Sequence, residues 1–226
     1  MSPTAWLGEP APHFTLPAID GDGTGSLSDY RGKSGLLLGL FRGMYCPLCR
    51  RKIAQMGLVR EKLHNLGVDA LAIVASKVEH ARLYYRYHPT AVRLAADPEM
   101  SVLRALSVPK PLVTPQLREN FRTTLVDPFG ELAAPVPITK IAMTLNERDG
   151  YDLNATDMEE MAQQWRWDLA TQLMARFLID RDGLVRWVDI EGAGQGMAGI
   201  GTLATDDELF AAVRGLSHSA RDQRRD

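Results

Sequence analysis

Residues 35–50 read GLLLGLFRGMYCPLCR, and within this segment the pattern changes from strand to helix. The apolar run 35–41 ends at a polar Arg-Gly pair, as expected of a short buried strand. After Cys49, apolar residues recur at every third or fourth position, which predicts one face of a helix that Gly67 ends. The residues of this face are Ile53, Met56, Val59, Leu63 and Leu66.

The same segment holds the only two cysteines of the chain, Cys46 and Cys49, spaced as C-x-x-C. Cys46 is predicted near the helix N-terminus and Cys49 in its first turn. Unpaired backbone N–H groups and the positive end of the helix dipole stabilise a thiolate there. Four basic side chains add positive charge: Arg42, Arg50, Arg51 and Lys52. We therefore expect a lowered pKa for at least one thiol and a redox role for the pair.

A zinc site, a structural disulfide and an inert buried pair are the alternatives to a redox dithiol. Zinc needs two histidines as well, but those between residues 64 and 88 lack the H-x3-5-H spacing, and His13 and His218 are far away in sequence. A structural disulfide in so short a loop would constrain the unfolded chain very little. An inert pair would gain nothing from the positive charge around it. We predict a redox site without a metal.

The composition is that of an ordinary globular protein, with 226 residues, 45% hydrophobic and 24% charged. This length suits one domain with an insertion. A formal net charge of -2 gives no general attraction to nucleic acid or to anionic lipid. Residues 1–10 lack the basic and apolar regions of a signal peptide, and no segment approaches membrane-spanning length, so we expect a cytoplasmic protein. Residues 218–226 are predicted to be a flexible tail.

Strand and helix patterns alternate beyond the first helix. Strand-like runs at residues 68–75 and 92–95 flank a helical pattern at 78–87. This β-α-β progression predicts a sheet with helices on both faces. Asp97-Pro98 then opens a helix that carries Val102, Leu103 and Leu106.

The C-terminal part of the chain contains clear signals for a hairpin and a helix. Residues 176–180 and 184–188 flank Arg181-Asp182-Gly183, a turn sequence that predicts a β-hairpin. A final helix is expected from Thr205, because its hydroxyl and Glu208 fit a capping box.

Residues 194–199, GQGMAG, match the letters of a G-x-G-x-x-G nucleotide-binding loop. Such a loop belongs in a unit that has a second strand and an acidic residue about twenty positions further on. Here that position falls in the polar C-terminal tail. We interpret the segment as a mobile glycine-rich loop.

Residues 109–170 lack a regular pattern, because prolines interrupt any long element in the first half of this segment. We interpret it as an insertion within the domain. Its role is either a surface elaboration or dimer contact, which we favour, or a lid that shapes the redox site. The aromatic residues available to such a lid are Phe121, Phe129, Trp165 and Trp167.

Five segments, in order, resemble the peroxiredoxin-like proteins of the AhpC/TSA (redoxin) group within the thioredoxin-fold superfamily. They are residues 8–16 (GEPAPHFTL), 27–33 (LSDYRGK), 41–49 (FRGMYCPLC), 97–98 (DP) and 177–183 (FLIDRDG). The resemblance spans roughly two thirds of the chain and leaves the insertion unmatched. It implies an α/β thioredoxin-like fold in one domain over residues 1–226. The expected fold is a central mixed sheet flanked by helices, with the insertion 109–170 before the late hairpin.

The sequence departs from this family where peroxiredoxins bind peroxide, at P-x-x-x-T-x-x-C. Placing Cys49 at the peroxidatic position puts Cys46 at the threonine and Arg42 at the proline. The late-strand arginine of peroxiredoxins, or the cis-proline of thioredoxins, should fall near Met174. Arg176 lies on the same strand face, and it either replaces that arginine or is a solvated residue at the strand end.

Tyr45 and Pro47 complete the predicted site. Tyr45 stands where thioredoxins usually carry tryptophan, so it either packs beside the disulfide or anchors the loop in the core. His13 and His64 would carry protons only if folding brought them near Cys49.

Two reactions fit the dithiol. In a thiol-disulfide oxidoreductase, the Cys46 thiolate attacks a substrate disulfide and Cys49 resolves the mixed disulfide. In a thiol peroxidase, Cys49 attacks a hydroperoxide and Cys46 condenses with the sulfenic acid. We predict the first, with an antioxidant or redox role, and keep the second as the alternative. A third hypothesis is a redox sensor or binding module that does not turn over.

The predicted chemistry uses the two thiols and needs no cofactor. Its partners would be a disulfide or hydroperoxide substrate and a thioredoxin-type or small-thiol reductant. Relatives often dimerise, so the resemblance also implies a homodimer. No nucleic-acid or membrane partner is expected.

Overall fold

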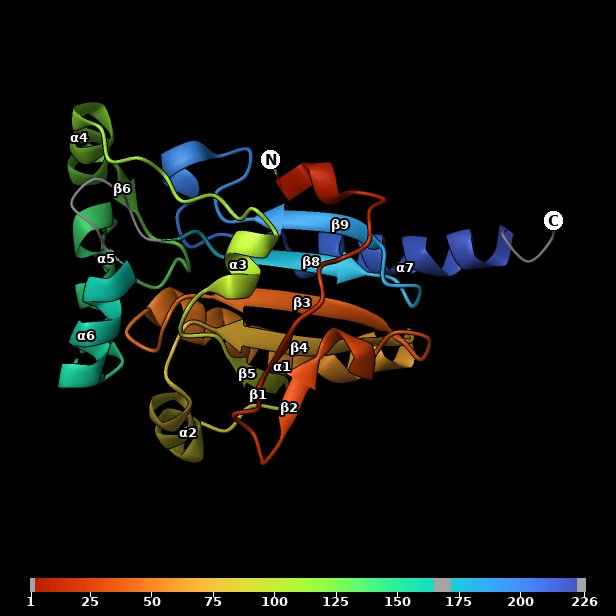
Figure 1. Ribbon diagram of the computed structural model, residues 1–226. Coiled ribbons are helices and arrows are strands. Elements are labelled where there is room, and N and C mark those ends of the chain that lie inside the picture. The colour runs from red at the N-terminus through yellow and green to blue at the C-terminus, as the bar shows by residue number, and fades with distance from the viewer. Residues whose placement is uncertain (1–2, 165–171, 223–226) are drawn as a thin grey trace.

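The computed structural model describes residues 3–164 and 172–222. Its central sheet consists of β3 (Gly35–Phe41), β4 (Val68–Val74), β5 (Arg93–Ala96), β8 (Ala175–Ile179) and β9 (Val185–Ile190). The strand order is β5-β4-β3-β8-β9 (Figure 1). The β3-β4 and β4-β5 pairs are parallel, and the β3-β8 and β8-β9 pairs are antiparallel. The predicted mixed sheet is therefore confirmed.

The central strand β3 has the bounds that the sequence predicts. All of its residues are buried, since the sheet is covered on both faces. Its side chains alternate between two apolar clusters. Leu37 and Phe41 face one cluster, whereas Leu36, Leu38 and Leu40 face the other.

Helix α1 (Pro47–Asn65) follows β3 after a short loop, as predicted. Four of the five predicted apolar residues are buried: Ile53, Met56, Val59 and Leu63. Leu66 is 39% exposed, because it forms the C-cap beyond the last helical turn. Gly67 then takes a φ of +76°, and its N–H donates to the His64 carbonyl. This left-handed residue ends the helix, as expected.

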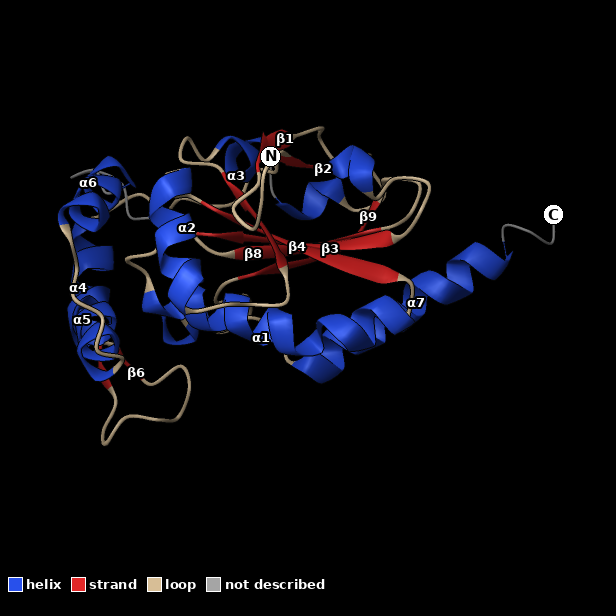
Figure 2. Ribbon diagram, turned by 90° about the horizontal axis from the view of Figure 1, so that it is seen from below, coloured by secondary structure: helices blue, strands red, loops and turns tan. Residues whose placement is uncertain are grey.

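The two faces of the sheet are covered differently (Figure 2). The buried side chains of α1, α2 (Val78–Tyr87) and α7 (Asp206–Asp222) join one cluster. The other face carries η2 (Leu27–Asp29), α3 (Ser101–Ala105) and the β1-β2 hairpin (Thr15–Pro17, Thr24–Ser26). The remaining short elements are η1 (Pro3–Trp6) and η3 (Gly196–Gly199). Within the described ranges, no helix combines the length and apolar character that a membrane crossing requires.

Helices α3 and α7 are both found where the sequence predicts a helix, but α3 begins later than expected. Helix α3 begins at Ser101, later than Asp97-Pro98, because the Asp97 carboxylate reaches forward to accept from the Ser101 hydroxyl and the Val102 N–H. Before α7, the Thr205 N–H donates to Glu208 Oε2 at 2.7 Å, and the Glu208 N–H donates to Thr205 Oγ1 at 3.3 Å. This is the predicted capping box.

The late hairpin is confirmed, and the helix after it is longer than expected. β8 and β9 pair across a turn in which Gly183 has a φ of +90°. Helix α7 continues to Asp222, so residues 218–222 of the predicted tail are helical. Residues 223–226 lie outside the described ranges.

The segment 109–170 is more regular than its sequence suggests. It contains α4 (Pro115–Thr123), β6 (Leu125–Val126), β7 (Val136–Pro137), α5 (Ile138–Arg148) and α6 (Ala155–Gln164). Prolines start helices here: Pro115 occupies the first turn of α4, and Pro137 is the N-cap of α5. Figure 1 shows α4, α5 and α6 stacked beside one end of the sheet. Trp165 and Trp167, proposed for a lid, lie outside the described residues.

We expect Gly39→Ala to destabilise the fold, because α1 packs closely on β3 at this position. A Cβ atom there would lie 2.6 Å from the Phe41 ring and 2.7 Å from the Met56 sulfur. Overpacking of this kind costs about 1–3 kcal/mol. The matched control is Gly215→Ala in α7, where a Cβ meets no atom within 4 Å. That change should stabilise the helix by about 0.5–1 kcal/mol. Urea unfolding measures the free energy of unfolding of both variants. Equal changes in the two would contradict the close packing of α1 on β3 at Gly39.

Candidate active site

Cys46 is the N-cap residue of α1, and its sulfur takes the place of the usual capping oxygen. The Cys49 N–H donates to Cys46 Sγ at 3.3 Å. Pro47 occupies the first helical position, where its missing N–H leaves no donor unsatisfied. The fold thus points a backbone dipole at the Cys46 sulfur, which favours its anionic form.

Arg42 lies on the other side of this sulfur, in the loop after β3. Its Nε donates to Cys46 Sγ at 3.4 Å. The same guanidinium donates to Glu191 Oε2 at 2.8 Å and Oε1 at 3.0 Å, and to the Gln172 carbonyl at 3.1 Å. Arg42 is only 5% exposed, and the Glu191 side chain is fully buried. A buried cation therefore joins the Cys46 sulfur to a buried carboxylate.

These surroundings separate the pKa values of the two thiols. Burial raises the pKa of Cys46, but a hydrogen bond from the Cys49 thiol, the Arg42 charge and the Cys49 N–H together lower it to about 6. Burial raises the pKa of Cys49 well above its ordinary value, and the neighbouring Cys46 sulfur raises it further. The expected lowered pKa is found, and it belongs to Cys46.

Both thiols are shut off from solvent, with Cys46 4% and Cys49 0% exposed. Part of the cover comes from the segment 109–170. The Tyr45 hydroxyl donates to Gln164 Oε1 at 2.7 Å, and Gln164 Nε2 donates to the Ala75 carbonyl at 3.1 Å. These bonds connect the C-terminal end of α6 to the active-site loop and to the end of β4.

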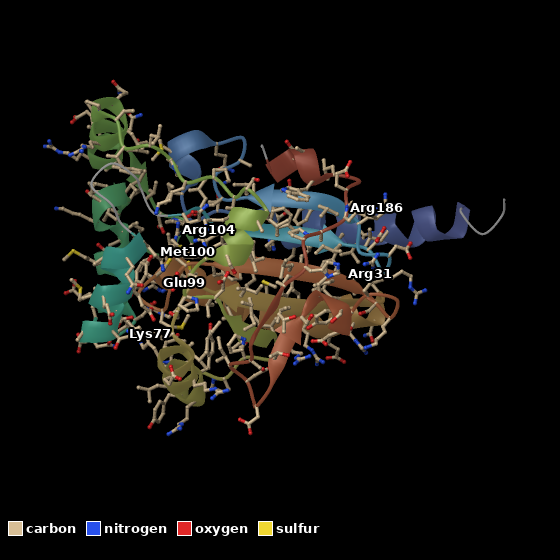
Figure 3. The ribbon with its side chains drawn as sticks, viewed as in Figure 1. Arg31, Lys77, Glu99, Met100, Arg104 and Arg186 are labelled. Atoms are coloured by element: carbon tan, nitrogen blue, oxygen red, sulfur yellow. The ribbon has the colours of Figure 1, made fainter. Side chains whose placement is uncertain are left out.

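A second connection joins α6 to the same loop through Glu160. The Ser76 hydroxyl donates to Glu160 Oε2 at 2.7 Å and accepts from the Met44 N–H at 3.1 Å. The Lys77 N–H donates to Glu160 Oε1 at 2.8 Å, and Figure 3 shows Lys77 between α2 and α6. The Nδ1 atom of His80, in α2, lies 3.2 Å from Glu160 Oε1. Helix α6 is therefore anchored by buried polar contacts.

Helix α5 is attached through Arg50, which is buried beneath the active-site loop. Arg50 donates to the Met44 carbonyl at 2.7 Å and to Asn146 Oδ1 at 2.9 Å. The Asn146 amide in turn donates to the Tyr45 carbonyl at 3.2 Å. The guanidinium also stacks on the Tyr151 ring, 4.0 Å from its centroid. Three sets of contacts thus join α5 and α6 to the cysteine loop, which is the position that the lid interpretation requires.

Met174 and Arg176 have different surroundings. Met174 is fully buried in the cluster that contains both cysteines, but its side chain carries no charge. Arg176 is 4% exposed, so it is not a solvated strand-end residue. Its guanidinium donates to Asp189 and to the Ala204 carbonyl, and none of the hydrogen bonds described for it reaches a cysteine. The cation beside the thiol is Arg42.

The two histidines considered as proton carriers lie elsewhere. His13 is exposed in the N-terminal segment. His64 lies at the far end of α1, where its Nδ1 is 2.9 Å from Asp69. Neither is placed beside Cys49.

Glu191, the acidic partner of Arg42, was not among the residues predicted for the site. The only signal for it is a carboxylate directly after the apolar end of β9, at the start of the glycine-rich loop. That loop folds back so that the Gly201 N–H donates to Glu191 Oε1 at 2.8 Å. The G-x-G-x-x-G letters thus belong to a loop beside the redox site.

We expect Arg42→Lys to raise the pKa of Cys46 from about 6 towards its ordinary value. Lysine keeps the charge but cannot contact the sulfur and both Glu191 oxygens in the fork geometry of arginine. At pH 6 the rate of Cys46 alkylation by iodoacetamide should fall roughly threefold to tenfold. Arg51→Lys is the control, since Arg51 pairs with Asp149 and Glu131 instead. An unchanged pH profile in Arg42→Lys would show that Arg42 does not stabilise the thiolate.

Solved structures with similar folds include two peroxiredoxin-type proteins and a thiol:disulfide interchange protein. The reduced 2-Cys peroxiredoxin of Plasmodium vivax matches with a TM-score of 0.59 and 14% identity, covering 96% of this chain and 84% of that one. The peroxidoxin BcpB of Mycobacterium tuberculosis matches with a TM-score of 0.56 and 14% identity, covering 93% and 97%. A Chlorobium tepidum protein assigned as the thiol:disulfide interchange protein DsbE gives 0.50 and 18%, covering 92% and 97%. These likenesses show the thioredoxin fold.

Among curated proteins, none matches the sequence. The family model of the AhpC/TSA family matches residues 7–134, which include both cysteines and extend into the segment 109–170. The match covers more than half of the chain. The chain therefore belongs to the AhpC/TSA family, and it is a thiol-dependent peroxidase or oxidoreductase.

Proposed function

We propose that the protein is a dithiol-disulfide oxidoreductase in which Cys46 is the nucleophile and Cys49 the resolving thiol. The observation that carries this proposal is the Cys46 sulfur, which accepts hydrogen bonds from Arg42 Nε and the Cys49 N–H. With a pKa of about 6, Cys46 is largely a thiolate at neutral pH. Arg42, Tyr45 and Pro47 support this site, and Met174 packs in the same cluster.

The first step is attack of the Cys46 thiolate on a substrate disulfide. A bond forms between Cys46 Sγ and one substrate sulfur, and the substrate S–S bond breaks. The other substrate sulfur leaves as a thiolate and takes up a proton. The negative charge beside Arg42 has then left the site.

The second step releases the substrate. The Cys46 thiolate is one cause of the high pKa of Cys49, so formation of the mixed disulfide makes Cys49 easier to deprotonate. Cys49 gives its proton to the departing substrate sulfur and attacks Cys46 Sγ, so that the bond between Cys46 Sγ and the substrate sulfur breaks. The Cys46–Cys49 disulfide forms, and the substrate has gained two electrons.

Hydroperoxide reduction is the second candidate, and the burial of Cys46 favours it. A small hydroperoxide reaches a 4% exposed sulfur more easily than a protein disulfide does. The Cys46 thiolate would attack one peroxide oxygen, the O–O bond would break, and the other oxygen would leave as water or an alcohol after taking up a proton. The resulting sulfenic acid would condense with Cys49 to form the Cys46–Cys49 disulfide and release water. The raised pKa of Cys49 argues against the alternative in which Cys49 attacks first.

The catalytic cycle also needs a reductant, a thioredoxin-type protein or a small thiol, to regenerate the dithiol. We further propose a single domain with 109–170 as an insertion that closes over the site, and a homodimer, which the family resemblance implies. The cycle starts from the reduced dithiol, so it fits a reducing compartment such as the cytoplasm.

The test is NADPH oxidation through a thioredoxin-thioredoxin reductase relay, with a model protein disulfide or hydrogen peroxide as substrate. We expect turnover that is lost in Cys46→Ser, and a mixed disulfide trapped at Cys46 in Cys49→Ser. If only peroxide is turned over, the second candidate is correct. A sulfenic acid at Cys49 in Cys46→Ser would reverse the two roles. A single oxidation without turnover would identify a sensor.

The closed site makes a separate prediction about access. Gln164→Ala removes the bonds to Tyr45 and Ala75, so the lid should open more often. The alkylation rate of Cys46 should rise roughly threefold or more at every pH, while the pH midpoint stays in place. The control Gln116→Ala removes an exposed contact with Asn120 in α4 and should change neither quantity. An unchanged rate in Gln164→Ala would mean that this contact does not limit access.

A further inference from the structure

Glu191 accepts four hydrogen bonds at a place that is shut off from solvent. Its Oε2 accepts from Arg42 Nη1 at 2.8 Å and from the Met174 N–H at 3.0 Å. Its Oε1 accepts from Arg42 Nη2 at 3.0 Å and from the Gly201 N–H at 2.8 Å. The residue is 3% exposed. Four donors therefore fix one carboxylate against Arg42, whose Nε faces Cys46.

The charges in this cluster do not balance in every redox state. With Cys46 as a thiolate, one cation serves two anions. With the Cys46–Cys49 disulfide formed, Arg42 and Glu191 neutralise each other. The titratable groups that face the cluster are Cys49 from α1 and, more weakly, Lys52 from the same helix, while Tyr85 of α2 faces Cys49. The redox state of the dithiol thus decides whether the buried cluster carries a net charge.

We propose that Glu191 is a positioning residue that shares the Arg42 guanidinium with the Cys46 sulfur and thereby sets the reduction potential of the dithiol. It acts in two ways. It holds Arg42 so that Nε faces the sulfur, and it takes part of the cation's attraction away from the thiolate. The second effect makes the reduced form less stable than it would be beside an unpaired arginine, and so keeps the dithiol a better reductant.

Removing the Glu191 charge should therefore move the equilibrium in a defined direction. In Glu191→Gln, Arg42 has the Cys46 thiolate as its remaining anionic partner. The reduced form gains this stabilisation, whereas the disulfide form leaves a buried cation unpaired. The variant should be more oxidising than the parent and have a lower Cys46 pKa.

A matched control lies two residues earlier, within β9. Asp189 is 7% exposed and pairs with a buried arginine, but its partner is Arg176 instead of Arg42. Asp189→Asn thus breaks a comparable buried ion pair without touching the cation beside Cys46. It should lower stability and leave the dithiol equilibrium in place.

The experiment equilibrates full-length protein in glutathione buffers of graded ratio, quenches with acid and counts free thiols by mass. We expect the equilibrium constant of Glu191→Gln to shift roughly tenfold towards the dithiol, about 30 mV for a two-electron couple. The pH midpoint of Cys46 alkylation should fall. Asp189→Asn should stay within twofold of the parent. Thermal melts identify variants that have not folded.

A second variant covers the case in which Glu191→Gln does not fold. Arg42→Gln combined with Glu191→Gln removes both charges, so Cys46 loses its cation and its pKa should rise, opposite to the single change. A folded Glu191→Gln with the parent's potential, or the same shift in both variants, would overturn the proposal. The inference rests on Cys46 as the nucleophile, but the equilibrium needs only the Cys46–Cys49 disulfide. Loss of substrate turnover and an unmoved potential are therefore separate failures.

Discussion

Arg42 lies in the loop between β3 and α1, and its guanidinium is buried. Protein groups instead of water therefore have to balance its positive charge. Glu191 supplies a carboxylate and Cys46 supplies a sulfur that is most stable as a thiolate. The loop after β3, the N-cap of α1 and the loop after β9 are all fixed by these contacts. Much of the local fold therefore follows from placing one buried cation beside a helix N-terminus.

This arrangement explains why two chemically identical thiols differ. Cys46 meets the cation and the Cys49 N–H, whereas Cys49 lies deeper and beside the Cys46 charge. In the proposed mechanism, attack from Cys46 removes that charge, which prepares Cys49 for the next step. The proposed lid of α5 and α6 would keep water away and strengthen these electrostatic effects, and it would also limit which substrates reach the sulfur.

The sequence predicted those parts of the fold that depend on local patterns. The strand 35–41, the helix 78–87 and the capping box at Thr205 are found as expected, because each depends on residues close in sequence. The contacts of the lid and the role of Glu191 were missed for the opposite reason. They join residues far apart along the chain, such as Arg42 with Glu191, and no spacing rule reports such pairs. Arg176 was predicted on the correct strand face, but its buried partner Asp189 could not be foreseen.

The most direct test of this account locates the reactive thiol. Reduced wild-type protein is treated at pH 7 with a limiting amount of N-ethylmaleimide, digested, and analysed by peptide mass spectrometry. We predict that the first label is found on Cys46, with Cys49 modified only after unfolding. A label that appears first on Cys49 would contradict the stabilised Cys46 thiolate and the mechanism built on it.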